Sequence, residues 1–212
     1  METIEVRPQS LNIVLLYDVL DVTKVPLDPI KASTKFNLIS LLPVEVMGGL
    51  LALASDPLKA KVTIQSNRLE YIDEQDLPFP ERQLDELWKL LRAIPSFSVK
   101  SYGVNFFLRV TPRHDKNSGT FVAEHYIKDG LQLERTLDQP ILSASVRLLL
   151  GTPDCYRDLR ITPAAITSKE IVFQYHLHRD ISIAETEKLA QTIAHSVTES
   201  WSECDQWLKR LP

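Results

Sequence analysis

Two segments of the chain carry apolar residues at every third or fourth position, the spacing of a helix with one buried face. These positions are Leu84, Leu87, Trp88, Leu91 and Ile94 in the first segment, and Ala190, Ile193, Val197, Trp201, Cys204, Leu208 and Leu211 in the second. Ser182 followed by Glu185 is a capping-box pattern that indicates where the second helix begins. The pattern therefore predicts two principal helices, at about 80–94 and 183–210.

Most of the remaining chain alternates apolar and polar residues, the period of a half-buried strand. Asp129-Gly130 within 120–134 is a strong signal for a tight hairpin turn, so we expect two strands there as well. Residues 41–54 could be a strand or a buried helix, although Gly48-Gly49 disfavours a long helix. The other predicted strands are 10–19, the two halves of 61–73, 102–110, 144–150, 158–162 and 170–178.

The order of these elements predicts the fold class. Helices do not alternate with single strands, so a doubly wound parallel fold is disfavoured. The pattern indicates an α+β protein, mainly an antiparallel sheet or sheets, with helices on one face. The polar stretch 111–120 is the best candidate boundary between two similar-sized lobes, 1–112 and 119–212. The two lobes could also form one continuous domain.

This layout resembles that of a family of uncharacterised bacterial two-lobed α+β proteins. In that family a strand like "YGVNFF" (102–107) follows the first helix, and a long helix closes the chain. The resemblance implies a bacterial source and the two-lobed fold. It implies no activity, cofactor or site residue.

Charge and hydropathy narrow the range of partners. The net charge of the 212 residues is −4, which argues against a nucleic-acid partner, because such proteins cluster Lys and Arg on a basic face. The most apolar window, 46–54, is far shorter than the roughly 20 residues that cross a bilayer. No secretory leader pattern is visible, and Cys155 and Cys204 form no disulfide framework. We therefore expect a cytoplasmic protein with free thiols and no membrane association.

The stretch "VFQYHLHRD" (172–180) is a candidate metal site. Alternate residues of a strand share one face, so His176, His178 and Asp180 would lie on the same side. Two histidines and a carboxylate could bind zinc or iron with water completing the shell. The competing interpretation, which we favour, is that these residues form the solvated face of an antiparallel sheet.

A small basic cluster lies beside the predicted boundary. Arg109, Arg113 and Lys116 could contact a phosphate or an acidic partner. In a chain of net charge −4, a charged loop that keeps a hairpin tip soluble is the favoured alternative.

No nucleophile, phosphate-loop or metalloprotease motif occurs in the chain, so the sequence leaves open whether the protein is an enzyme. The favoured hypothesis is a non-catalytic binding or protein-interaction module, without a cofactor, that forms a homo-oligomer or binds a protein partner through an open sheet edge. One alternative is a metal-dependent hydrolase that uses His176 and His178. A second alternative is a small-molecule sensor or carrier with an apolar pocket.

Overall fold

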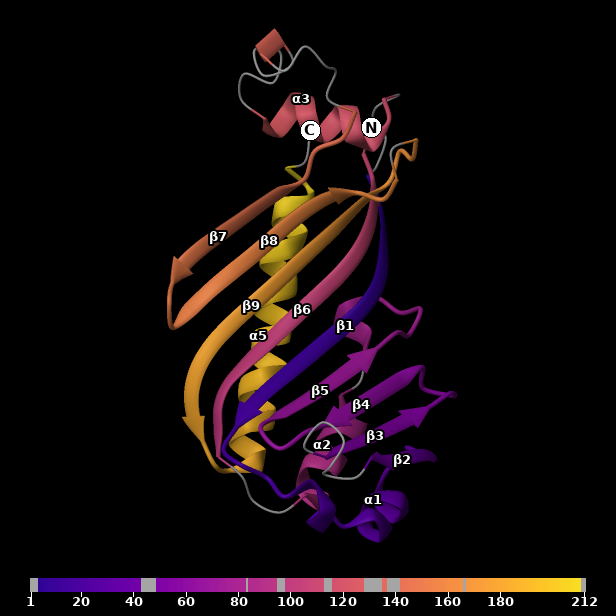
Figure 1. The fold of residues 1–212 in the computed structure, drawn as a ribbon, viewed down its shortest axis with the longest axis vertical. Helices are drawn as coiled ribbons and strands as arrows, with labels where there is room; N and C mark the ends of the chain where they lie inside the picture. The colour runs from indigo at the N-terminus through magenta and orange to yellow at the C-terminus, as the bar shows by residue number, and fades with distance from the viewer. Residues whose placement is uncertain are drawn as a thin grey trace.

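In the computed structural model, nine strands of the described residues form one antiparallel sheet with the order β2-β3-β4-β5-β1-β6-β9-β8-β7 (Figure 1). The structure describes residues 4–42, 49–82, 84–94, 98–112, 116–127, 135–136, 142–165 and 167–210. The strands are β1 Glu5–Tyr17, β2 Leu38–Leu42, β3 Leu50–Ser55, β4 Ala60–Ile64, β5 Arg68–Asp73, β6 Val99–Thr111, β7 Val146–Thr152, β8 Cys155–Pro163 and β9 Ile171–Ile183.

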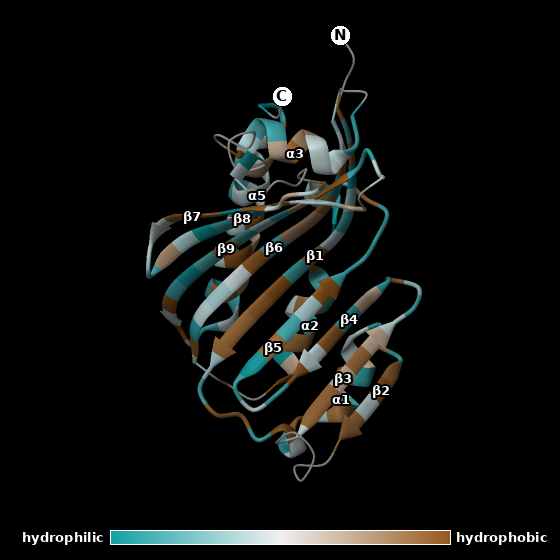
Figure 2. Cartoon of the chain, turned by 45° about the horizontal axis from the view of Figure 1, so that its top comes forward, coloured by the Kyte–Doolittle hydropathy of each residue, from teal (hydrophilic) through white to brown (hydrophobic). Residues whose placement is uncertain are grey.

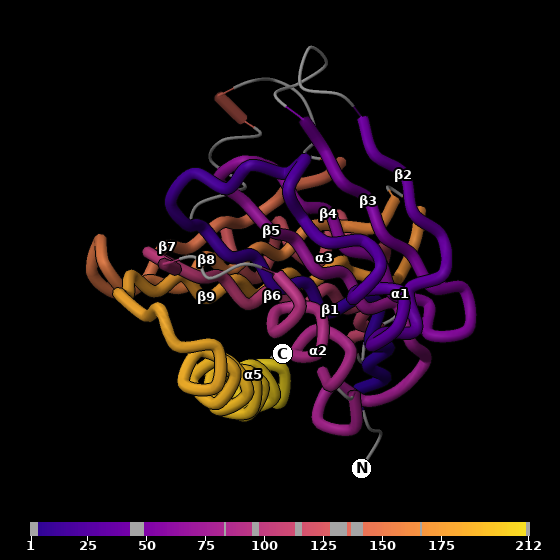
Figure 3. Tube along the Cα trace, turned by 90° about the horizontal axis from the view of Figure 1, so that it is seen from below, coloured from indigo at the N-terminus to yellow at the C-terminus, as the bar shows by residue number. Residues whose placement is uncertain are grey.

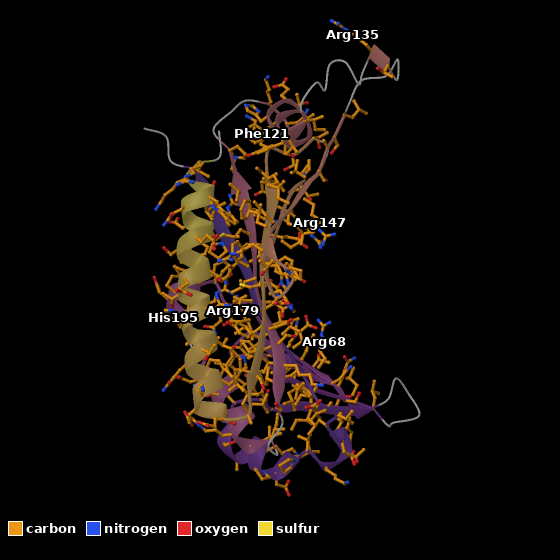
Figure 4. The ribbon with its side chains drawn as sticks, turned by 90° about the vertical axis from the view of Figure 1, so that its left-hand side faces the viewer. Arg68, Phe121, Arg135, Arg147, Arg179 and His195 are labelled. Carbon is orange, nitrogen blue, oxygen red and sulfur yellow. The ribbon has the colours of Figure 1, made fainter. Side chains whose placement is uncertain are left out.

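The helices lie mainly on one side of this sheet. They are α1 Leu27–Ser33, α2 Asp85–Ala93, α3 Ser118–Tyr126 and α5 Thr186–Leu208, with short 3₁₀ turns η1 Val22–Lys24 and η2 Phe79–Glu81. The long helix α5 packs against β6 and β9 and touches α2 (Figures 1 and 3). Among the described residues, the opposite side of β5, β1, β6, β9 and β8 carries no helix, and we call it the open face (Figure 4).

The core lies between the sheet and α5, and it follows the predicted alternation. On β6, Val104, Phe106 and Leu108 are fully buried, and their neighbours Asn105 and Phe107 face the other way. The Phe106 ring packs against other aromatic rings of the core, with centroids 4.8 Å from Phe79, 5.7 Å from Trp201 and 5.8 Å from Tyr175. The aromatic cluster therefore joins the sheet to η2 and to α5.

The structure confirms an α+β fold with an antiparallel sheet, but both predicted helices begin later than expected. The first predicted segment contains the separate turn η2, and α2 begins only at Asp85, because Arg82 is extended and its guanidinium is buried among backbone carbonyls. The last helix begins at Thr186 and not at 183. Ile183 still pairs with Val99 of β6, so Ser182 lies in β9 and caps nothing.

The strand prediction for 120–134 is wrong where the structure describes it. Residues Ser118–Tyr126 form α3, whose N-terminus is capped by the Asn117 side chain, which accepts a hydrogen bond from the Thr120 N–H at 2.8 Å. The Asp129-Gly130 turn signal lies outside the described residues. A local cap therefore prevailed over the alternation pattern.

Strands from both halves of the chain join one sheet, because β6 pairs with β1 on one side and with β9 on the other. The division into lobes 1–112 and 119–212 remains a prediction. The segment 41–54, which could have been strand or helix, contributes the end of β2 and most of β3, and 43–48 lie outside the described residues.

The expectations about membrane association and about the cysteines can be compared with the described residues. None of their helices has the length and apolar character needed to cross a membrane. Both cysteines are free thiols, and Cys204 is on the buried face of α5, where burial raises the pKa of its thiol.

Candidate functional site

A chain of hydrogen bonds crosses four strands at the centre of the open face. Glu70 of β5 accepts from Arg68 Nη2 at 3.1 Å and from Asn12 Nδ2 at 2.7 Å. The backbone oxygen of Asn12 accepts from Asn105 Nδ2 at 3.2 Å. Asn105 Oδ1 in turn contacts His176 Nδ1. Strand register produces this chain, because Asn12, Asn105 and His176 are cross-strand neighbours in β1, β6 and β9.

The directions of these hydrogen bonds fix the state of His176. The Asn105 amide nitrogen already donates to Asn12, so its oxygen is the acceptor and His176 Nδ1 carries the proton. Burial, and secondly the neighbouring His178, lower the pKa of His176 below its ordinary value, which favours the neutral ring. A neutral ring protonated at Nδ1 presents Nε2 as a hydrogen-bond acceptor.

The second histidine has different partners. His178 Nε2 lies 2.9 Å from Asp180 Oδ1, and its ring stacks on Tyr156 with centroids 4.8 Å apart. The ring centroids of His176 and His178 are 6.4 Å apart. In the part of the chain that the structure describes, no group of three or more His, Cys, Asp or Glu side chains could hold a metal ion. The three side chains lie on the open face, and metal binding by His176, His178 and Asp180 remains a prediction.

A nearly buried carboxylate lies next to the hydrogen-bonded chain. Asp158 of β8 is 5% exposed and is the cross-strand neighbour of His176. Arg147 donates to it from Nε at 3.0 Å and from Nη2 at 2.7 Å, and Arg160 Nη2 donates at 2.8 Å. These hydrogen bonds, those from Arg147 foremost, lower the pKa of Asp158 to about 2. The ion pair between Asp158 of β8 and Arg147 of β7 therefore stabilises the β7–β8 hairpin.

We expect the Asp158→Asn variant to be less stable than the wild type at neutral pH by about 2 kcal/mol. A folded-state pKa lowered below the unfolded value of about 3.9 contributes stability that is complete above that value. The contribution disappears as pH falls from about 4 toward 2, so the two proteins should converge there. Urea unfolding at a series of pH values measures the difference in free energy of unfolding between the two proteins.

Asp180→Asn, at an exposed carboxylate of the same face, is the control and should change stability by less than about 0.5 kcal/mol. A stability difference for Asp158→Asn that stays constant down to the lowest pH would contradict the assignment.

The predicted basic cluster is divided among separate ion pairs. Arg109 lies on β6, where its Nη1 is 2.9 Å from Glu170 Oε2. Lys116 precedes α3 and pairs with Glu124. Arg113 lies outside the described residues. Contact of these residues with an anion or an acidic partner remains a prediction.

The edge strands β2 and β7 expose large apolar side chains. Figure 2 shows hydrophobic residues, in brown, along both strands. In β7, Leu148, Leu149 and Leu150 are 43%, 59% and 42% exposed. In the described residues the only strand beside β7 is β8. The other edge, β2, exposes Leu38, Leu41 and Leu42.

Sequence reasoning missed the two asparagines of the hydrogen-bonded chain and the leucines of β7 as functional candidates. Asn12 and Asn105 interrupt runs of apolar residues in predicted strands, and that interruption is the signal that could have identified them. The "RLLL" run (147–150) reads as an ordinary buried strand until its position in the sheet is known.

A scan against protein-family models and a search of curated proteins returned no match for this chain.

Proposed function

We propose that this protein is a non-catalytic interaction module that binds a second copy of itself through the edge strand β7. The observation that carries the proposal is the run of three exposed leucines, Leu148 to Leu150, in the outermost strand of the sheet. An unpaired, apolar strand edge offers backbone hydrogen-bonding groups and apolar surface together. Soluble proteins ordinarily protect such an edge with charges, prolines or a covering segment.

The composition of β7 makes it complementary to itself. When two copies of β7 pair in antiparallel orientation around a two-fold axis at Leu149, this residue faces its own counterpart. Leu148 of each copy then faces Leu150 of the other. The three leucines of each chain would therefore pack against those of the other on both faces of the extended sheet.

Charge favours the same arrangement. Arg147 is the only charged residue of β7, and in this register it faces Gly151 of the second copy. Its guanidinium is already ion-paired with Asp158 within its own chain. Pairing therefore brings no like charges opposite one another, which would be destabilising.

The ion pairs of the open face support a protein partner over a nucleic acid. Arginines of the open face lie beside carboxylates, as Arg68 does beside Glu70 and Arg109 beside Glu170. A face that balances its cations internally releases few counterions from a phosphate backbone, so it has little electrostatic attraction for nucleic acid. We also propose the cytoplasm as the location of the protein, in line with its free thiols.

We expect the wild-type protein to sediment as a dimer and the Leu149→Lys variant to sediment as a monomer at the same concentration. The substitution places two lysines directly opposite one another at the two-fold axis, where their repulsion opposes pairing. Sedimentation equilibrium over a range of protein concentrations measures the association.

The matched control is Leu38→Lys, which places the same charge on the other edge strand, β2. This variant should remain dimeric. A wild-type protein that is monomeric at every concentration would contradict self-association. A dimer that Leu38→Lys dissociates and Leu149→Lys does not would contradict the choice of β7.

A further inference from the structure

The open face contains a shallow depression between the side chains of neighbouring strands. It has a volume of about 260 Å³ and lies over β5, β1, β6 and β9, at the centre of the sheet. Side chains that define it include Asn12, Arg68, Phe107 and His176, with Gly103 in its lining. The labelled Arg68 side chain lies on the side of the sheet away from α5, whereas His195 lies on the helix side (Figure 4).

Gly103 makes the space for the His176 ring. A Cβ atom at position 103 would lie 2.8 Å from His176 Cε1 and 3.4 Å from the backbone oxygen of Leu177. Real Cβ atoms do not approach neighbours as closely as the first of these distances. The absence of a side chain at Gly103 therefore lets the imidazole lie against the strand and line the depression.

Two residues that line the depression, Asn12 and His176, each carry a hydrogen-bond acceptor without a partner among the described residues. Asn12 Nδ2 donates to Glu70, so Asn12 Oδ1 is the free end of the amide, and this oxygen is buried without a hydrogen-bond partner among the described residues. His176 Nδ1 is the protonated nitrogen, which leaves Nε2 as an acceptor without a described partner. A buried polar atom in a native protein is rarely left unsatisfied, so Asn12 Oδ1 indicates a missing partner.

The other groups of the depression complete its chemistry. Arg68 supplies N–H donors, and its positive charge is balanced by Glu70. Val14, Leu16 and Phe107 supply apolar surface. The site thus combines neutral acceptors, a charge-balanced donor and an apolar wall in one place.

We propose that this depression binds a neutral, hydroxyl-rich ligand, a saccharide. A hydroxyl group both donates and accepts, so hydroxyls on one ring can donate to Asn12 Oδ1 and His176 Nε2 and accept from Arg68. The apolar face of the sugar ring would rest on Phe107. A carboxylate or phosphate group only accepts hydrogen bonds, so it would not pair with these acceptors, and Arg68 offers it no unbalanced charge because Glu70 already pairs with it. The site does not involve β7, so it is independent of the proposed self-association.

The first test is binding of the fluorescently labelled protein to a printed glycan array. The glycans that are retained are then titrated as free sugars by isothermal calorimetry, which separates recognition of the sugar itself from recognition of a larger glycoconjugate. The proposal expects at least one glycan to bind, with the ¹⁵N resonances of His176 shifting during the titration. If no glycan is retained and no shift is seen with millimolar glucose, galactose, mannose or N-acetylglucosamine, the proposal is overturned.

Two variants locate the site. Gly103→Ala fills the space beside the His176 ring, and Arg68→Met removes the donor at the rim, so each should weaken glycan binding at least tenfold. Arg109→Met is the matched control, because Arg109 projects from the same face of β6 but lies outside the depression, and its binding should equal that of the wild type. If Gly103→Ala does not fold, Arg68→Met decides the question by itself. Binding that Arg68→Met leaves unchanged would overturn the assignment to this depression.

Discussion

Replacing Arg82 with Met is expected to lower the free energy of unfolding by about 3–5 kcal/mol, since removing one partner of a buried ion pair leaves the other uncompensated. The side chains of Arg82 and Asp73 are both fully buried, with Arg82 Nη1 3.5 Å from Asp73 Oδ1. The guanidinium also donates to the backbone oxygens of Asp73, Gln75 and Leu77 at 2.7, 2.6 and 3.0 Å. The variant would leave three carbonyl groups and one carboxylate without their partner.

Urea unfolding at a fixed protein concentration, followed by circular dichroism, measures this difference. The control is Arg68→Met, the same change at a half-exposed arginine whose ion pair with Glu70 faces solvent. Exposed pairs contribute about 0–1 kcal/mol, so this variant should unfold close to the wild type. If the two variants were equally stable, the buried guanidinium would not have the structural role assigned to it.

The second large effect is expected at Phe106. Phe106→Ala should destabilise the protein by about 3–5 kcal/mol, because the ring is fully buried and its removal leaves a cavity among Phe79, Tyr175 and Trp201. The cavity would lie between the sheet and α5, where the surrounding helices cannot close it without losing their own contacts. The same urea titration measures the change.

The adjacent residue provides a matched control for Phe106. Phe107 has the same side chain on the opposite face of β6, where it borders the depression and is only half buried. Phe107→Ala should cost about 1 kcal/mol or less. A loss of stability as large as that of Phe106→Ala would show that the open face is packed against something that the single chain does not contain.

The candidate site combines residues that the sequence could and could not identify. Strand periodicity was sufficient to put His176, His178 and Asp180 on one face, since side-chain alternation is a local property of the backbone. It could not bring Asn12 and Asn105 beside His176, because their contacts depend on the pairing of β1, β6 and β9. The neutral acceptor on His176 follows from that pairing and not from the residue itself.

What the sequence by itself determined is the part of the fold that follows from local periodicity. The spacing of Ile193, Val197 and Trp201 was sufficient to predict a long helix, and the alternation around Phe106 was sufficient to predict a strand with one buried face. Both patterns record which side of an element meets the core. Both patterns can be recognised in the sequence because burial of apolar side chains is the main driving force of folding.

Only the tertiary structure decided which elements became neighbours and where each one stopped. Because Ile183 pairs with Val99, the last helix begins only at Thr186, and burial of Arg82 separates η2 from α2. The order of the sheet placed the leucines of β7 at its edge, although their sequence is that of an interior strand. The physical reason is that hydrogen bonds between strands join residues far apart in the chain, so neither the register nor the edge is encoded in any local pattern.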